Sequence, residues 1–147
     1  MTYYLYRDRE DELGARVEYL YRVFHTYFLR CADVGGFICL KSFPFQDDDI
    51  CFITAHNTQA RALLSTGLRA ETLVLNCCFP KQFMRFCKKY RVYFCRVDER
   101  GFARFRSGSE YGTGFDVLDS ELLLLYSGKE DVMEKIRDAY TLIGGKK

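Results

Sequence analysis

Residues 50–97 carry five secondary-structure signals in only 48 residues. The pattern predicts a strand, a helix, a strand, a helix and a strand, in the order 50–54, 57–67, 71–75, 81–90 and 91–97. Apolar strands that alternate with helices are explained most economically by a parallel sheet that helices cover. We therefore expect an α/β fold: one layered domain with a mostly parallel central sheet, one β-hairpin, and helices on both faces.

The composition favours one folded domain over residues 1–147. Of the chain, 48% is apolar and 16% is aromatic, which is enough for a packed core at this length. The charged fraction of 29%, together with only two prolines, argues against disorder. No run rich in serine, proline or glutamine indicates a linker.

The remaining elements are predicted from periodicity and turn residues. Apolar residues at helical spacing favour a long helix over 13–31, which Gly35 and Gly36 follow. Ser127 and Glu130 form a capping box that opens a last helix, which Gly144 and Gly145 end. The other expected elements are strands at 3–6, 37–43 and 122–125, a hairpin of 91–97 with 102–106, and a loop at 107–113.

The location of the protein is predicted from what the chain lacks. Its first residues do not follow the basic-then-apolar layout of a signal peptide, and no run of about 18 apolar residues predicts a membrane span. The seven cysteines are odd in number and form no C-x-x-C motif, which suits free thiols in a reducing compartment. We expect a cytoplasmic protein without a metal site, a cofactor or a membrane partner.

Polar turns follow the carboxyl ends of three strands that are predicted to be parallel. In open α/β sheets ligands bind at this edge, and helix N-termini that begin there favour anions. Because polar residues also cap most helices, a structural role is the alternative for each turn. The residues predicted to bind a phosphate-sized ligand are His56, Asn57, Thr58, Asn76, Ser127, Gly128 and Lys129.

His56 is the candidate catalytic residue if the protein is an enzyme. It is the only histidine outside the predicted N-terminal helix, and a histidine at a strand end can act as a base or a nucleophile. Cys77 and Cys78 offer a thiol near a helix start, although paired cysteines among apolar residues more often pack in a core. The sequence therefore leans towards a protein without catalytic activity.

Positive charge is concentrated between residues 81 and 106. This segment holds nine basic and two acidic residues, a net charge of +7, whereas the whole chain carries +2. Such asymmetry raises the local concentration of phosphate-bearing or acidic ligands. The simpler interpretation is that these charges form the solvated side of an amphipathic helix. The predicted basic patch consists of Lys81, Arg85, Lys88, Lys89, Arg96, Arg104 and Arg106.

Three short segments carry a family resemblance: Phe94-Cys95-Arg96 on the predicted hairpin, then Gly108-Ser109, then Glu121. With the order of elements over residues 50–140, they resemble in outline one half of the phospholipase D-like phosphodiesterase fold, which has H-x-K, Gly-Ser and Glu at these places. The resemblance implies the fold and a phosphate-binding surface at which Arg96 holds phosphate. Because the nucleophilic histidine is missing, it does not imply the activity.

The function that the sequence favours is a binding or regulatory module for a nucleotide or a nucleic acid. The binding module could also engage an acidic protein surface. The alternatives are a phosphodiesterase or nuclease that uses His56, and a small effector that acts only by docking onto another protein and takes no small ligand. The sequence is also compatible with a homodimer. Tyr3, Tyr4 and Tyr6 on an exposed edge strand would suit pairing between two copies.

Overall fold

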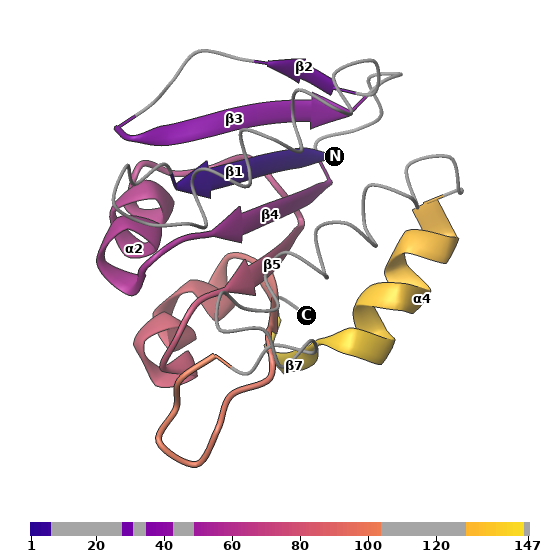
Figure 1. The fold of residues 1–147 in the computed structure, drawn as a ribbon. Helices are drawn as coiled ribbons and strands as arrows, with labels where there is room; N and C mark the ends of the chain where they lie inside the picture. The colour runs from indigo at the N-terminus through magenta and orange to yellow at the C-terminus, as the bar shows by residue number, and fades with distance from the viewer. Residues whose placement is uncertain (7–27, 31–34, 43–48, 104–128, 146–147) are drawn as a thin grey trace.

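The computed structural model of the protein describes residues 1–6, 28–30, 35–42, 49–103 and 129–145 (Figure 1). Within these residues seven strands form one sheet, and three helices accompany it. No helix in these ranges is both long and apolar enough to cross a membrane. The elements are β1 Thr2–Tyr6, β2 Phe28–Arg30, β3 Phe37–Ser42, β4 Ile50–Thr54, α2 Asn57–Ser65, β5 Thr72–Asn76, the 3₁₀ helix η2 Pro80–Lys88, β6 Arg91–Phe94, α4 Lys129–Ala139 and β7 Thr141–Gly144.

The centre of the sheet is parallel, as the sequence predicts. The strand order is β2-β3-β1-β4-β5-β6-β7, in which β1, β4, β5 and β6 run parallel to one another. The outer strands β2, β3 and β7 each pair antiparallel with their neighbours. Every residue of β4 and β5 is buried, which is the pattern of strands that are covered on both faces.

The two faces of the sheet carry different helices. Phe83 of η2 packs on Phe94 of β6, with ring centroids 5.5 Å apart, and Phe94 pairs in register with Leu75 of β5. Since neighbouring strand residues point to opposite faces, Asn76 points to the other face, where it accepts a hydrogen bond from Tyr140, the residue after α4. The helices therefore cover both faces, which confirms the predicted α/β architecture.

Two predicted helices end differently in the structure. The helix expected over 13–31 is wrong at its end, because Phe28–Arg30 form β2, which pairs with β3; residues 7–27 and 31–34 lie outside the described ranges. The last helix ends at Ala139, and Thr141–Gly144 form β7 against β6. In both places the segment forms a strand because it pairs with a neighbouring strand. Helical periodicity in the sequence does not indicate such pairing.

A close backbone approach explains the glycine near the end of β7. A Cβ atom at Gly144 would lie 2.9 Å from both the Cβ and the Sγ of Cys87 in η2. Any larger residue at this position would therefore push β7 away from η2. Glycine ends no helix here, and its small size lets the last strand pack against η2.

The first strand of the predicted hairpin is shorter than expected. β6 ends at Phe94, and a single bridge between Val97 and Ala103 joins the two arms around the turn 98–101. The expected continuation over 104–106, the loop at 107–113 and the strand at 122–125 lie outside the described residues.

The tyrosines of β1 do not lie on an edge strand, in contrast to the prediction. β1 lies between β3 and β4, and Tyr3 is buried with its ring stacked on that of Phe52 at 4.7 Å. Tyr4 and Tyr6 are partly buried and contact the ring of Phe37. Pairing between copies through an exposed β1 is therefore ruled out, because both sides of this strand are already occupied.

Truncation of the central stacked pair tests this packing. Phe52 is almost completely buried, so we expect Phe52→Ala to lower the free energy of unfolding by about 3–5 kcal/mol through lost burial and an unfilled cavity. Urea denaturation followed by circular dichroism measures the change. The exposed Met84→Ala serves as a control that shifts stability by less than about 0.5 kcal/mol. A loss below about 1 kcal/mol for Phe52→Ala would contradict the described core.

Candidate functional site

The carboxyl ends of β4 and β5 meet at a buried hydrogen-bond network. Thr54 and Asn76 stand opposite each other in the parallel register, and the Asn76 side-chain amide donates to the Thr54 hydroxyl at 3.2 Å. On its other side Asn76 accepts the Tyr140 hydroxyl at 3.1 Å. With 4% of its surface exposed, Asn76 is directed into the protein. The structure therefore gives Asn76 a structural role, joining two strands to the end of α4.

Asn57 connects the start of α2 to the segment that follows β5. Its side-chain oxygen accepts the backbone N–H of Cys78 at 2.8 Å, and its side-chain nitrogen donates to Gln82 of η2 at 3.1 Å. The sequence predicts Asn57 as the helix cap, whereas the structure makes it the first helical residue and places His56 at the N-cap, without a capping side-chain bond. The physical reason is that the Asn57 side chain is used between elements.

His56 and Thr58 are the exposed members of the first predicted turn. The His56 ring meets the edge of the Tyr6 ring with centroids 6.1 Å apart, and its backbone carbonyl accepts the N–H of Ala60 in the first turn of α2. Both side chains lie at the start of this helix. The first two predicted turns thus come together, since Asn57 and Asn76 lie at adjacent strand ends.

Of the third predicted turn, the structure describes only Lys129, which lies at the end of α4 opposite to Tyr140. Ser127 and Gly128 lie outside the described residues, and Lys129 is the first residue of α4. The opposite end of α4 lies at the carboxyl edge, because Tyr140 reaches Asn76 and Thr141 pairs with the end of β6. Eleven helical residues span about 16 Å. Figure 1 shows the first turn of α4 at the far right, whereas α2 lies at the left, where the arrowheads of β1 and β4 point.

Two buried cysteines near this edge, Cys77 and Cys95, have raised pKa values. Burial raises the pKa of Cys95 to about 12, and its sulfur donates a hydrogen bond to the Cys77 carbonyl at 3.1 Å. Burial, assisted by the nearby Cys95 and Cys78, raises the pKa of Cys77 well above its ordinary range. Because the thiolate is the nucleophile, these pKa shifts argue against catalysis by Cys77.

The predicted basic patch is divided by the structure. Arg96 donates a hydrogen bond of 3.2 Å to the Asp138 carbonyl in the last turn of α4, so it holds a helix end, where positive charge is favourable. Arg104 and Arg106 lie outside the described residues. The remaining four residues, Lys81, Arg85, Lys88 and Lys89, are exposed on η2 or directly after it.

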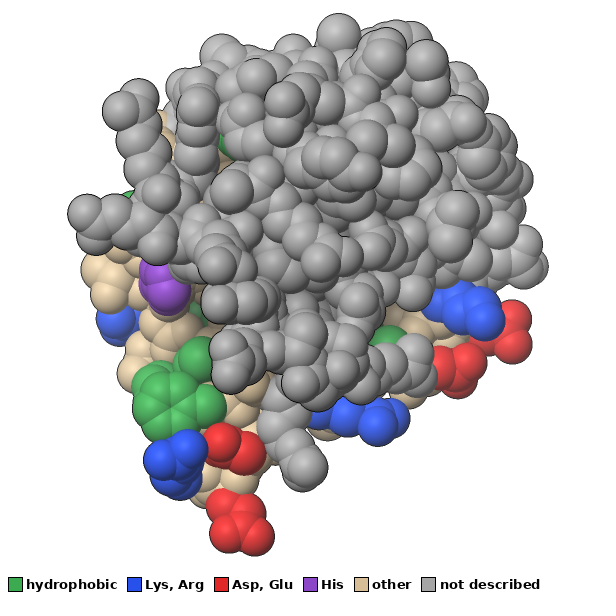
Figure 2. All heavy atoms as spheres, in the orientation of Figure 1, with side chains coloured by type: hydrophobic (Ala, Val, Ile, Leu, Met, Phe, Trp, Pro, Cys, Tyr) green, Lys and Arg blue, Asp and Glu red, His purple; other side chains and the backbone are tan. Residues whose placement is uncertain are grey.

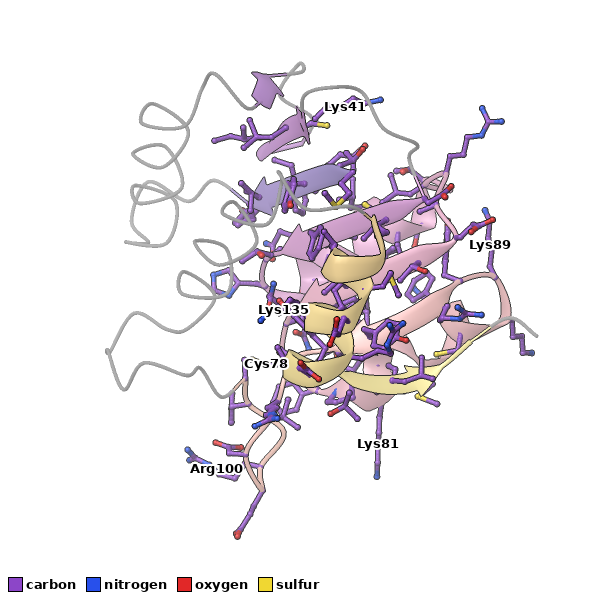
Figure 3. The ribbon with its side chains drawn as sticks, turned by 90° about the vertical axis from the view of Figure 1, so that its right-hand side faces the viewer. Lys41, Cys78, Lys81, Lys89, Arg100 and Lys135 are labelled. Carbon is purple, nitrogen blue, oxygen red and sulfur yellow. The ribbon has the colours of Figure 1, made fainter. Side chains whose placement is uncertain are left out.

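η2 and Arg91 together present positive charge on the surface. Residues 81–91 contain five basic residues and no acidic one. Within the described ranges none of the five forms an ion pair. Figure 3 shows Lys81 extending away from the body of the protein. We name this surface, formed by Lys81, Arg85, Lys88, Lys89 and Arg91, the η2 basic surface.

Aromatic rings support two of these cations. The Arg85 guanidinium lies 4.7 Å from the centroid of the Phe86 ring, and the Lys89 ammonium lies 5.3 Å from that of Tyr90. The Tyr90 hydroxyl in turn donates to the Leu68 carbonyl, which fixes the ring. Cations over rings lose less freedom on binding while their charged ends stay in water. The η2 basic surface is therefore partly preorganised.

Two residues of this region are absent from the predicted site. Gln82 receives the Asn57 bond, and Phe102 is exposed at the hairpin tip and packs on Phe79, which directly precedes η2. The turn at Asp98 and Gly101 is visible in the sequence, but its contact with Phe79 depends on tertiary structure. No local signal in the sequence indicates that contact.

Comparison of the chain with protein-family models, with curated proteins and with solved structures gave no match. The resemblance to the phospholipase D-like fold therefore gains no support from relatives. The function has to be argued from the surface itself.

Loss of the Asn57 side chain is expected to destabilise the contact between α2 and η2. Asn57→Ala leaves the Cys78 N–H without its acceptor, which we expect to lower the free energy of unfolding by about 1–3 kcal/mol in urea denaturation. Asn57→Asp retains the acceptor and should recover most of that loss. Equal stability of wild type and Asn57→Ala would show that this hydrogen bond contributes nothing.

The raised thiol pKa values predict a stability that falls at alkaline pH. The folded protein holds the Cys95 proton more tightly than the unfolded chain, so this contribution is complete below about pH 8.5 and is lost as the pH rises towards 12. In urea denaturation at stepped pH, Cys95→Ala should therefore show a shallower decline, by up to about 1.4 kcal/mol per pH unit. Identical slopes for both proteins would contradict the buried thiol.

Proposed function

We propose that the protein is a non-catalytic module that binds the phosphate backbone of nucleic acid through the η2 basic surface. The observation that carries the proposal is the set of five exposed basic residues in 81–91, which no acidic residue of the segment accompanies. Such a surface attracts a polyanion because each phosphate contact releases condensed counterions. No base-reading motif accompanies it, so the expected binding depends little on sequence.

The shape of η2 favours an extended ligand over a single nucleotide. A 3₁₀ helix has three residues per turn and a rise of about 2 Å per residue, so Arg85 and Lys88 lie in one row about 6 Å apart. Gln82 begins the same row and is also exposed. A row of donors on a convex helix can follow a backbone, whereas small ligands are usually enclosed in concave sites.

The start of α2 extends this surface. The hydrogen bond between Asn57 and Gln82 holds the first turn of α2 beside the first turn of η2. The first N–H groups of a helix and its dipole favour anions, and the exposed His56 and Thr58 lie at this point. The strand-end turn and the basic helix would thus contact one backbone together, with η2 supplying most of the charge.

Charge reversal on η2 tests the proposal. In fluorescence anisotropy with a labelled 20-nucleotide oligonucleotide at about 50 mM salt, we expect Arg85→Glu/Lys88→Glu to bind at least about tenfold more weakly than wild type. Two lost phosphate contacts should also reduce the slope of log K against log salt by about 1.4–2. Circular dichroism confirms that each variant is folded.

Lys135→Glu/Arg137→Glu on α4 is the matched control. Both residues are exposed, and both double variants change the net charge from +2 to −2. The control should bind almost as tightly as wild type. Equal losses in the two variants would show that only net charge matters, and an unchanged affinity of the η2 variant, or binding to an acidic protein alone, would overturn the proposal.

A further inference from the structure

An exposed aromatic ring lies beside the beginning of the η2 basic surface. Phe102 at the hairpin tip has 44% of its surface exposed, and its ring meets that of Phe79 with centroids 4.9 Å apart. The Arg100 guanidinium lies 5.3 Å from the centroid of the Phe102 ring. Since Phe79 directly precedes Pro80, the first residue of η2, the exposed ring is adjacent to the basic helix.

The hairpin holds this ring in place. The Asp98 carboxylate accepts the backbone N–H groups of Arg100 and Phe102 at 2.8 and 3.0 Å. The Asp98 N–H donates to the Phe102 carbonyl, and the Gly101 N–H donates to the Asp98 carbonyl. Four hydrogen bonds within five residues therefore fix the turn, so the exposure of Phe102 belongs to an ordered loop.

A second set of contacts fixes the hairpin to η2. The Phe79 N–H donates to the Gly101 carbonyl at 2.6 Å, and Phe79 adopts a left-handed conformation with φ of 55°. A Cβ atom at Gly101 would lie 2.8 Å from the Phe79 ring, and Gly101 itself has a φ of 89°. A strained phenylalanine and an obligatory glycine thus position the tip against the start of the helix.

The arrangement combines the two contacts that single-stranded nucleic acids require. A positively charged surface follows the backbone, and an aromatic ring offers a face on which any base can stack. Bases in a duplex are stacked on each other and cannot reach such a ring. The Arg100 guanidinium is planar and can extend the stack, while the exposed Glu99 repels phosphate and favours a backbone path towards η2.

We propose that Phe102 is a base-stacking platform and that the ligand of this surface is single-stranded nucleic acid. The inference rests on the proposed function and adds the class of nucleic acid to it. Figure 3 shows Arg100 and Lys81 both extending from the lower end of the molecule. Figure 2 shows hydrophobic side chains, with basic and acidic ones beside them, open at the lower left, where the orange hairpin of Figure 1 lies.

Truncation of the ring tests the proposal directly. We expect wild type to bind a labelled dT20 strand more tightly than a 20-base-pair duplex at the same salt. Stacking of one base accounts for a change of about 5- to 150-fold, so Phe102→Ala should weaken dT20 binding by a factor in this range. Its salt slope should stay unchanged because no charge is removed, and Phe102→Tyr should restore the affinity.

A spectroscopic readout separates stacking from a structural role. The chain contains no tryptophan, so Phe102→Trp introduces a single indole whose fluorescence a stacked base should quench on addition of dT20. Leu142→Trp on β7 replaces a side chain that is 53% exposed and should show little quenching. Each variant carries one indole, which lies at the hairpin tip in the first and on β7 in the second.

The outcomes distinguish this inference from the proposed function. Unchanged dT20 affinity of Phe102→Ala, equal quenching of the two indoles, or tighter binding of the duplex would overturn the stacking platform, while loss of binding in the η2 variant would still support the function. If wild type binds neither strand nor duplex, the proposed function fails and the platform fails with it.

Discussion

The carboxyl edge of this sheet depends on the buried side-chain amide of Asn76. One amide group forms hydrogen bonds with hydroxyls from two different elements, Thr54 of β4 and Tyr140 after α4, and all three residues are buried. A buried polar group without partners costs as much as the hydrogen bonds that it fails to make. The arrangement is therefore specific: β4, β5 and the end of α4 must meet with these residues in register.

Hydrogen bonding within the protein distinguishes the polar groups with a structural role from those that can bind a ligand. Three predicted site residues form hydrogen bonds within the protein. Asn57 bonds to Cys78 and Gln82, and Asn76 belongs to the buried network. Arg96 donates to the Asp138 carbonyl. The cations of the η2 basic surface have no such engagement in the described part of the chain. Affinity for an anion would therefore come from helix-surface charge, and the strand ends would supply its scaffold.

The sequence predicts the middle of the fold well because each signal there is local. β4 has the predicted bounds, and α2, β5 and η2 begin within one residue of the predicted positions, since apolar runs and Pro80 mark them. The sequence does not predict β2 and β7, because these segments become strands through pairing with β3 and β6 and not through a local signal. Part of the candidate site can be predicted from the sequence, because the lysines and arginines of η2 form a visible cluster. The position of Lys129 away from the carboxyl edge could not be predicted, because it depends on the direction of α4. The position of Phe102 could not be predicted either, because it depends on the contact with Phe79.

The place of β1 in the sheet has a consequence for the order of folding. Its neighbours come from residues 37–42 and 50–54, so this first strand has no partner on either side when it leaves the ribosome. The sheet cannot grow outwards from its N-terminal strand as synthesis proceeds. Its centre closes only after later segments have been made, and until then β1 exposes two unsatisfied backbone edges to any chaperone or neighbouring chain.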